Sequence, residues 1–310
     1  MTQNPKILVV AGPTASGKKS LALALAQRFG GEIVSADSRK VYRGLDIGTA
    51  KPSPEDRARV PHHLIDVVDP DEPFNAAEWV ERAASAVSDI HGRGRLPIIS
   101  GGTGFYIRAF REGLSSGMAS SPVIRRELEH ELAESGPRAL HDRLTAIDPA
   151  RAAELHVRDT VRVMRAIEVY LVTGRTFTDM RETAAIRGGD YDYHSIGITM
   201  ERQRLYERID ARVDEMIACG LHDEVKSLLE RGYGRNLTAL DTVGYKEWFA
   251  FIDGVAPFEE CREAVKRNTR RYAKRQLTWF RSEPDIRWID VLDGDECDNA
   301  VENTVRWLNG

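Results

Sequence analysis

Apolar residues fall into short runs along this chain, and the runs alternate with helical patterns. Ile7–Ala11 is an apolar, β-branched run that indicates a buried strand, and Glu32–Ala36 and Leu96–Ser100 repeat this pattern. Between them, Lys18–Phe29 and Asn75–His91 read as helices. Strands that alternate with helices predict an α/β fold, with a mostly parallel sheet that carries helices on both faces.

The middle of the chain differs, because only helical patterns are visible from about residue 122 to residue 175. Thr160–Thr173 has an apolar stripe at helical spacing, and Gly174 is placed to cap its end. We therefore predict a helical insertion at 117–195 within a catalytic core formed by 1–116 and 196–310. In the second part of the core, we expect strands at Ser195–Thr199 and Ile286–Val291, and a long helix at Phe258–Phe280.

Composition and charge restrict the partners. The chain has 310 residues, 44 basic and 48 acidic, so a nucleic acid must be bound by a local basic patch. The three cysteines, Cys219, Cys261 and Cys297, form no close pair, which argues against disulfides and zinc and fits a cytoplasmic protein. No apolar run reaches the length of a membrane span, and we expect a monomer.

A glycine-rich loop, Gly12–Lys18, lies between the first predicted strand and the first predicted helix. Backbone N–H groups and the helix N-terminus make such a loop a phosphate site, although a plain turn with a surface lysine is the alternative. Lys19 stands where such loops usually have the hydroxyl that binds Mg²⁺, and an ammonium cannot bind a metal. Either another hydroxyl or water serves Mg²⁺, or Lys19 points outward. This departure weakens the prediction of nucleotide hydrolysis more than the prediction of diphosphate binding.

Two further features carry chemistry. Asp37 follows the second predicted strand, next to the phosphate loop, where it is suited either to accept a proton or to bind Mg²⁺. The predicted helix near the C-terminus gathers most of a basic patch: Arg262, Lys266, Arg267, Arg270, Arg271, Lys274, Arg275 and Arg281. Its aromatic residues, Tyr272, Trp279 and Phe280, are able to stack on bases or to pack inward, and their helical spacing favours packing.

Several motifs share their order with one known family. They are GPTASGK at 12–18, SADS at 35–38, DIGTAKP at 46–52, PHHLID at 61–66, GGTGFY at 101–106, VGYK at 243–246 and AKRQLTWFR at 273–281. The chain resembles the tRNA dimethylallyltransferases, also called tRNA isopentenyltransferases, over nearly its whole length. DIGTAKP is the most specific of these motifs. The zinc finger of the eukaryotic family members has no counterpart here.

The resemblance implies a reaction and a P-loop type of fold. The exocyclic N6 of an adenosine would displace diphosphate from C1 of dimethylallyl diphosphate, with Mg²⁺ as cofactor. The target adenosine lies immediately 3′ of the anticodon in tRNAs that read codons starting with U. By resemblance Asp37 is the general base, Thr103 bridges the diphosphate and tRNA sides, and Arg212 contacts the diphosphate with Lys18. From pattern alone, Thr103 could equally satisfy a local turn.

The resemblance also assigns binding residues. The diphosphate set is Gly12, Pro13, Thr14, Ala15, Ser16, Gly17, Lys18 and Lys19. The set for the tRNA anticodon stem-loop is Asp37, Ser38, Arg39, Lys40, Thr103, Arg125, Arg162, Arg165, Asp241, Gly244, Tyr245, Lys246, Lys274, Arg275, Gln276 and Arg281. We read His62 and His63 as structural.

Three alternatives stay open at this point. The first is a small-molecule phosphotransferase that uses the same loop with ATP. The second is prenylation of free adenine nucleotides, which the helical insertion and the basic helix disfavour. The third is a non-catalytic RNA-binding module.

Overall fold

The chain forms two compact units. The structure is a computed structural model that describes residues 4–115, 120–183, 185–290 and 294–310. Unit 1 comprises Met1–Arg111 and Gly188–Gly310, and unit 2 comprises Glu112–Arg187. The insertion predicted at 117–195 begins five residues after the start of unit 2 and ends eight residues beyond its end, where residues 192–195 already belong to a strand of the unit 1 sheet.

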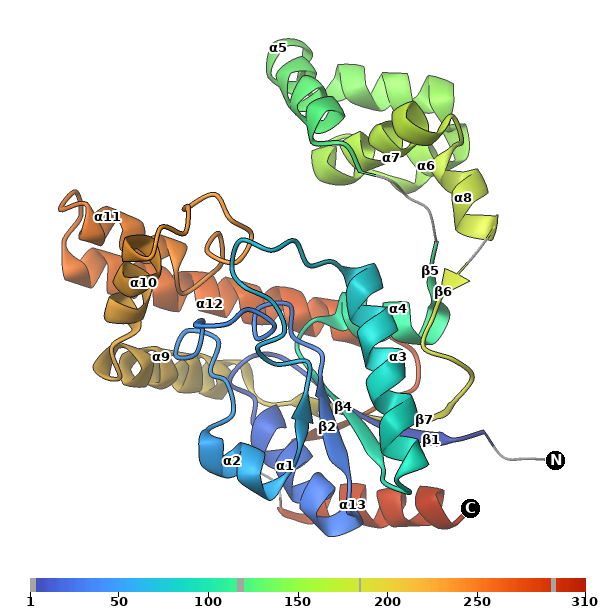
Figure 1. Cartoon of the computed structure of the whole chain (residues 1–310), viewed down its shortest axis with the longest axis vertical. Coiled ribbons are helices and arrows are strands. Elements are labelled where there is room, and N and C mark those ends of the chain that lie inside the picture. Colours follow the sequence, from blue (N-terminus) through green and yellow to red (C-terminus); the bar gives the residue numbers. More distant parts are fainter. Residues whose placement is uncertain (1–3, 116–119, 184, 291–293) are drawn as a thin grey trace. The chain divides into compact units, whose positions relative to one another are not determined.

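Unit 1 is built on a six-stranded parallel sheet with the strand order β3-β2-β4-β1-β7-β8 (Figure 1). The strands are β1 (Lys6–Ala11), β2 (Glu32–Ser35), β3 (His62–His63), β4 (Pro97–Gly101), β7 (Asp192–Thr199) and β8 (Ile286–Asp290). The predicted α/β class is confirmed. The sequence pattern missed β3, which has only two residues, and Val291, the predicted end of the last strand, lies outside the described residues.

The helices of unit 1 include three that the sequence predicts, at 18–29, 75–91 and 258–280, whose bounds agree with the structure within one residue, and others that it does not predict. They are α1 (Lys18–Phe29), α2 (Pro54–Arg59), α3 (Ala76–Gly92), α4 (Gly104–Glu112), α9 (Arg202–Ala218), α10 (Leu221–Glu230), the 3₁₀ turn η1 (Lys246–Trp248), α11 (Phe249–Ile252), α12 (Phe258–Arg281) and α13 (Gly294–Asn309). The last residue of α4 belongs to unit 2. Helix α1 ends where Gly30 adopts a left-handed conformation, with φ 63°.

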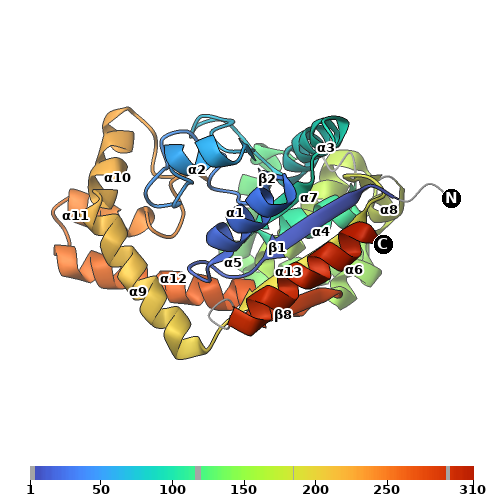
Figure 2. The same cartoon turned by 90° about the horizontal axis from the view of Figure 1, so that it is seen from below.

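Both faces of the sheet are covered. On one face, Leu8 and Val10 of β1 share a core with Leu25 of α1 and Ala300 of α13. Figure 2 shows α13 running beside β1. The other face receives Trp79 of α3, whose indole N–H donates to the carbonyl of Ser35 at 2.9 Å. The sheet is therefore buried on both sides, as its continuous apolar strands require.

A second core of unit 1 lies beyond the carboxyl end of β2. Tyr42 and Leu45 pack there against Leu221 and Val225 of α10 and against Trp248. Helices α9 and α12 cross at this end of the unit, and they contact each other (Figures 1 and 2). The loops that follow the parallel strands thus rest on helices from the C-terminal third of the chain.

Unit 2 is helical apart from one short strand pair. It contains β5 (Leu114–Ser115), α5 (Pro122–Ile147), α6 (Pro149–Glu154), α7 (Thr160–Thr173), α8 (Phe177–Thr183) and β6 (Ala185–Ile186), and β5 pairs antiparallel with β6. Gly136, with φ 77°, breaks α5 into two helices. Gly174 caps α7 in a left-handed conformation, as predicted. No helix in the described parts of the chain is long and apolar enough to cross a bilayer.

Candidate active site at the carboxyl edge of the sheet

The glycine-rich loop connects β1 to α1, in the place that the sequence predicts. Gly12 has φ 147°, and a Cβ there would lie 2.9 Å from the carbonyl oxygen of Ile198, so only glycine fits. Lys18, the first residue of α1, donates from Nζ to the carbonyl of Pro13 at 2.5 Å. The loop thus curls around its own lysine at a helix N-terminus, which is a geometry that suits an anion.

Gln276 joins this loop to a second one. Its Oε1 accepts the backbone N–H of Thr14 at 2.8 Å, and its Nε2 donates to the carbonyl of Gly102 at 2.9 Å. The side chain is buried. A residue predicted from the resemblance to bind tRNA therefore holds together the loops that follow β1 and β4.

Asp37 follows β2 on the same edge of the sheet. Its Oδ1 accepts the backbone N–H of Arg39 at 2.9 Å and that of Lys40 at 3.4 Å. Beside it, the backbone N–H of Thr103 donates to the carbonyl of Ala36 at 3.0 Å. The turn after β2 and the loop after β4 are thus in direct contact, as expected for neighbouring parallel strands.

The hydroxyl of Thr103 accepts the backbone N–H of Ser38 at 3.1 Å. It therefore bonds to the turn of the neighbouring strand and not to its own turn. Because a hydroxyl also carries a proton, Thr103 keeps one donor for a substrate oxygen. This arrangement is compatible with the bridging role that the family resemblance implies.

Helix α9 brings arginines to the loop. Arg208 Nε donates to the carbonyl of Ala15 at 2.9 Å, and Ala15 packs against Ile209. Arg212 lies one turn further along α9 and so shares the face that meets the loop. Arg212, which the resemblance assigns to the diphosphate, is thus directed toward the glycine-rich loop.

Three cations and one carboxylate gather here. Burial and the nearby charges of Arg212 and Lys40 lower the pKa of Lys18 to about 7, while the carboxylate of Asp37 opposes this shift. Burial also lowers the pKa of Lys40 and that of Arg212, and Asp37 again opposes both shifts. Among the described residues, neither the Lys40 ammonium nor the Arg212 guanidinium has a hydrogen-bond or ion-pair partner. Half-buried cations without partners are costly, so this cluster is suited to an anionic ligand.

Lys19 takes no part in this cluster's hydrogen bonds. Its ammonium pairs with Asp56 of α2 at 2.7 Å, and about half of its side chain is exposed. This pairing agrees with the alternative in which Lys19 points outward. The hydroxyl of Ser16, in contrast, is fully buried in the loop and has no partner among the described residues. No group of three His, Cys, Asp or Glu side chains in the described ranges is arranged to hold a metal.

The turn after β2 also contacts the loop that carries the VGYK motif. Arg39 donates from Nη1 to the carbonyl of Thr238 at 2.6 Å. Within that loop, Lys246 pairs with Asp241 at 2.9 Å. These two segments, which the resemblance assigns to tRNA binding, are therefore neighbours.

Tyr245 is not exposed, although the resemblance assigns it to tRNA. Its side chain is fully buried, and its hydroxyl donates to Glu224 of α10 at 2.7 Å. The same carboxylate accepts the backbone N–H groups of Asp46, Ile47 and Gly48 at 2.9, 2.8 and 3.2 Å. Glu224, which also accepts a hydrogen bond from the hydroxyl of Tyr245, thus holds the backbone of the DIGTAKP segment in place. Sequence reasoning missed Glu224, because nothing in its own segment marks it.

Only part of the basic patch of α12 is free. Arg262 and Lys266 pair with Asp214 of α9, and Arg270 pairs with Asp210. The exposed members without an ion-pair partner among the described residues are Arg267, Arg271, Lys274, Arg275 and Arg281. Acidic residues of α9 therefore neutralise part of the basic patch predicted from the sequence. The exposed basic residues of α12 begin at Arg267.

The three aromatic residues of this helix differ. Phe280 is buried, which confirms core packing for it. Trp279 is half-buried and lies under the guanidinium of Arg108 at 4.3 Å. Burial and the charge of Asp37 raise the pKa of Tyr272 to about 12, so Tyr272 lies on the side of α12 that meets the cluster.

The arginines predicted in the insertion are held by acids of unit 2. The buried carboxylate of Glu168 accepts from Arg125 at 3.1 Å and from Arg165 at 2.7 Å. Arg162 pairs with Asp159 at 3.1 Å. Arg125 and Arg162 nevertheless keep more than half of their side chains exposed, so both remain able to meet a phosphate.

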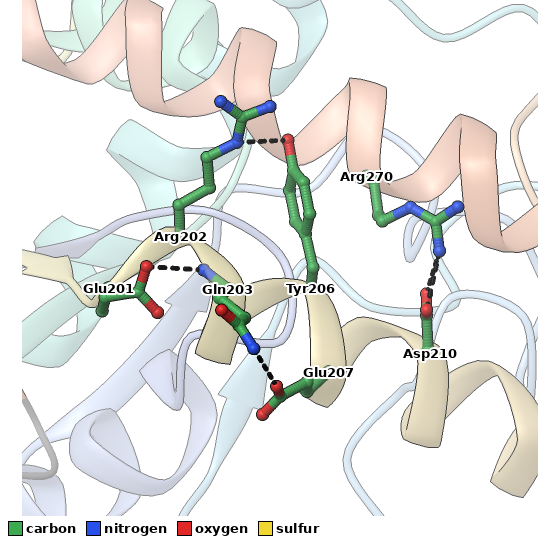
Figure 3. A pocket seen from close by; sticks show the side chains of 7 residues that line it. All are labelled: Glu201, Arg202, Gln203, Tyr206, Glu207, Asp210 and Arg270. Atoms are coloured by element: carbon green, nitrogen blue, oxygen red, sulfur yellow. Dashed lines mark hydrogen bonds and ion pairs between the residues drawn. The ribbon is translucent and has the colours of Figure 1, made fainter.

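A hollow of about 370 Å³ lies elsewhere on unit 1 (Figure 3). It is lined by Glu201, Arg202, Gln203, Tyr206, Glu207, Asp210 and Arg270. None of the predicted site residues lines it. Arg270 is paired with Asp210, and Arg202 donates to the hydroxyl of Tyr206 at 3.2 Å, so both arginines of this hollow already have polar partners.

Fold and site together define a class of protein. It is an α/β protein in which the loops after three parallel strands, together with α9, bring three cations and one carboxylate close to one another. Comparison with known proteins makes the assignment specific. The sequence profile of the IPP transferase family matches residues 40–283, and the chain belongs to that family.

The similar proteins cover nearly all of the chain. A tRNA dimethylallyltransferase of Geobacter sulfurreducens is 50% identical over 92% of both chains. The crystal structure of a tRNA isopentenylpyrophosphate transferase from Bacillus halodurans is 40% identical, with a TM-score of 0.70, over 98% of this chain and 99% of that one. A eukaryotic dimethylallyltransferase acting on tRNA is 28% identical, with a TM-score of 0.77, and is matched over 97% of this chain and 77% of its own. This chain is therefore a transferase of the IPP transferase family.

Proposed function

We propose that this protein transfers the dimethylallyl group of dimethylallyl diphosphate to N6 of the adenosine immediately 3′ of the anticodon, in tRNAs that read codons starting with U. The names of its relatives support prenyl transfer to tRNA. The observation that carries the proposal is the joint position of Asp37 and the cation cluster of Lys18, Lys40 and Arg212. One side of the site is suited to a leaving diphosphate, and the other is suited to accept a proton.

The transfer requires one bond to form as another breaks. The lone pair of N6 attacks C1 of the allyl group, and the C1–O bond electrons leave with the diphosphate. The N6 proton passes to the carboxylate of Asp37, which is held by the amides of Arg39 and Lys40. Loop amides, Lys18 and Arg212 stabilise the charge that develops on the leaving group, and this stabilisation lowers the barrier.

Mg²⁺ belongs to the same proposal. Lys19 cannot bind a metal and is engaged by Asp56, so we propose that the metal is held mainly by diphosphate oxygens and water. The hydroxyl of Ser16 is the protein oxygen in the loop that is buried without a partner, and we assign it as the protein ligand. When bound, the ion supplies charge neutralisation to the leaving diphosphate.

The tRNA would be bound by exposed basic residues. Lys274, Arg275 and Arg281 of α12 are exposed, and in unit 2 Arg125 and Arg162 are exposed on α5 and α7. The base must leave its stack to reach a half-buried carboxylate, which costs least in an unpaired loop. This requirement favours the anticodon loop as the target over a paired region.

Transfer of labelled prenyl groups tests the function directly. Purified protein is incubated with dimethylallyl diphosphate labelled in the allyl chain, Mg²⁺ and unmodified tRNA that reads a codon starting with U. We expect label on the adenosine 3′ of the anticodon, and none on a tRNA in which this position is guanosine. Absence of label on the first tRNA would reject the proposal.

Free adenine nucleotide separates tRNA transfer from its near alternative. A large excess of AMP should leave the labelling of tRNA unchanged, because the single phosphate of AMP gives it few contacts with the basic residues of α12 and unit 2. Efficient competition, with label recovered on AMP, would favour nucleotide prenylation instead.

A further inference from the structure

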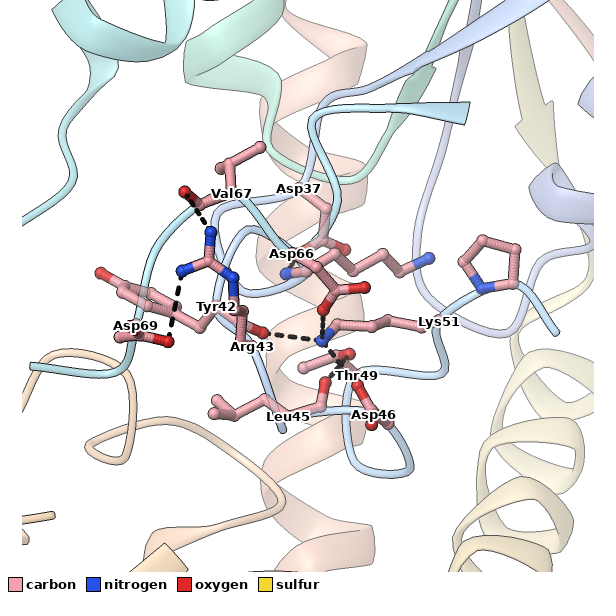
Figure 4. Close-up of polar contacts among 12 residues, drawn as sticks. Asp37, Tyr42, Arg43, Leu45, Asp46, Thr49, Lys51, Asp66, Val67 and Asp69 are labelled. Carbon is pink, nitrogen blue, oxygen red and sulfur yellow. Dashed lines mark hydrogen bonds and ion pairs between the residues drawn. The ribbon is translucent and has the colours of Figure 1, made fainter. Parts of the chain in front are cut away.

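A buried lysine outside the anion site organises the turn that carries Asp37. Lys51 is almost completely buried, with a side chain that is 3% exposed. Its ammonium donates to Asp46 at 2.6 Å, to Asp66 at 2.5 Å and to the carbonyl of Tyr42 at 2.7 Å. Figure 4 shows these three acceptors converging on Lys51. An ammonium has three protons, so these three acceptors use every hydrogen-bond donor of the Lys51 side chain.

The three acceptors belong to three different segments of the chain. Tyr42 lies just after the Asp37 turn, Asp46 opens the DIGTAKP segment, and Asp66 closes the PHHLID segment. Asp66 adopts a left-handed backbone conformation with φ 58°, which is uncommon for a residue other than glycine. A strained residue of this kind persists only when its surroundings hold it in place.

From Asp66 the contacts continue to the Asp37 turn. The backbone N–H of Asp66 donates to the carbonyl of Lys40 at 3.1 Å, and that of Val67 donates to the carbonyl of Val41 at 2.8 Å. Lys40 in turn gives its own backbone N–H to Asp37. An unbroken series of hydrogen bonds therefore runs from the Lys51 ammonium to the Asp37 carboxylate.

We propose that Lys51 is a positioning residue for the transfer reaction, which fixes the direction of the Asp37 carboxylate through Tyr42, Asp66 and the backbone of Lys40. The inference deepens the proposed function and rests on it. Lys51 contacts none of the residues of the glycine-rich loop by hydrogen bond or ion pair in the described structure. Its loss should therefore affect proton transfer to Asp37 and leave diphosphate binding largely intact.

The test replaces Lys51 with methionine, which keeps the length of the side chain and removes the charge. A displacement of about 1 Å at a reacting group can cost roughly 100-fold in rate. We expect Lys51→Met to lower kcat about 100-fold, with the KM for dimethylallyl diphosphate within about twofold of wild type. A kcat close to wild type, or a KM that rises in step with the loss of kcat, would overturn the inference.

A second buried charge serves as the matched control for stability. Glu32, at the opposite end of β2, is buried and pairs with Arg93 at 2.8 Å and with His63 at 2.7 Å. Both variants are assayed well below their melting temperatures, and Glu32→Gln should keep its kcat although it also loses a buried ion pair. If Glu32→Gln loses as much kcat as Lys51→Met, the effect is general destabilisation and the inference fails.

A double-mutant cycle tests the proposed route. Asp66→Asn keeps the backbone N–H that bonds Lys40 but weakens the contact to Lys51. If Lys51 acts through Asp66, the double variant should lose no more kcat than Lys51→Met alone. Independent losses that multiply would overturn the route.

Asp37→Asn, measured alongside, separates this inference from the proposed function. Absence of transfer by the wild-type protein would reject the proposed function, whereas an active Asp37→Asn variant would reject only Asp37 as the base and leave Lys51 with no carboxylate to position. An inactive Asp37→Asn together with a fully active Lys51→Met would reject only the role of Lys51.

Discussion

At the scale of single residues, the site is defined by charges that lack ion-pair partners among the described residues. In the same part of the chain, Lys18 donates only to the carbonyl of Pro13, and burial, followed by the nearby charges of Arg212 and Lys40, lowers its pKa to about 7. A bound diphosphate would reverse this effect, because negative charge beside an ammonium favours its protonated form. Ligand binding and protonation are therefore linked at this residue.

This linkage predicts proton uptake on binding. At pH 8 the free protein holds Lys18 largely neutral, so binding of dimethylallyl diphosphate should take up close to one proton per site, and affinity should fall as the pH rises above about 7. Calorimetry in buffers of different ionisation enthalpy measures the uptake. Lys18→Met should abolish it, and absence of uptake by the wild-type protein would contradict the assignment.

In unit 2, the residue with a strongly shifted pKa is Glu168. Burial alone would raise its pKa, but hydrogen bonds from Arg165, the backbone N–H of Ser121 and Arg125 outweigh burial and lower the pKa to about 2. A carboxylate whose pKa is lower in the folded state than in the unfolded state stabilises the fold above the unfolded value, here 4.5. That contribution is lost as the pH falls from about 4.5 toward 2.

Replacing Glu168 should therefore destabilise unit 2 in a pH-dependent way. A shift from 4.5 to about 2 corresponds to about 3 kcal/mol, so Glu168→Gln should lower the free energy of unfolding by about that amount at pH 7. The difference from wild type should shrink below pH 4.5. Denaturation followed by circular dichroism measures both, and the exposed Glu134, paired only with His130, provides the control Glu134→Gln. An equal loss in both variants would contradict the account.

At the scale of elements, helix bounds were predictable wherever local signals set them. Helices α1 and α7 begin and end at the predicted residues. Each ends where the glycine that follows it adopts a left-handed conformation. The charge of α12 was only partly predictable. The acids that neutralise its first half, Asp210 and Asp214, come from α9, 48 to 60 residues earlier in the chain, and no local pattern reveals that pairing.

The free half of α12 yields a prediction on tRNA binding. Each lysine or arginine that contacts a phosphate contributes about one unit to the dependence of log affinity on log salt concentration. We expect Lys274→Ala to weaken tRNA binding and to reduce that slope by about one unit. Arg262→Ala, at a residue engaged by Asp214 and Glu259, should leave the slope unchanged. Equal slopes for Lys274→Ala and wild type would remove α12 from the tRNA interface.

At the scale of the whole molecule, the parallel sheet could be predicted because its strands are continuous apolar runs separated by helices. The edge strand β3 could not, since two residues, His62 and His63, carry no periodicity. The positions of Asp37, Thr103 and the glycine-rich loop along the chain also followed from the pattern. Their supports did not. Gln276 and Glu224 act across 262 and 177 residues, and Lys51, although only 5 to 15 residues from its acceptors, joins three segments that only the folded chain brings together.

The whole arrangement has one consequence for the reaction. The sheet brings the loops after β1, β2 and β4 to one edge, so the carboxylate and the cation cluster meet although 19 residues separate Lys18 from Asp37 in the numbering. Binding and proton transfer are thus assigned to different loops of the same edge. A change confined to the Asp37 side chain should separate the two functions.

The most direct measurement is the single-turnover rate of Asp37→Asn with dimethylallyl diphosphate and tRNA already bound. Asparagine keeps the size of the side chain and an oxygen for the amides of Arg39 and Lys40, but it cannot accept the N6 proton. The account predicts a rate at least about 100-fold below wild type, with affinity for both substrates within a few fold. A single-turnover rate near that of wild type would contradict it.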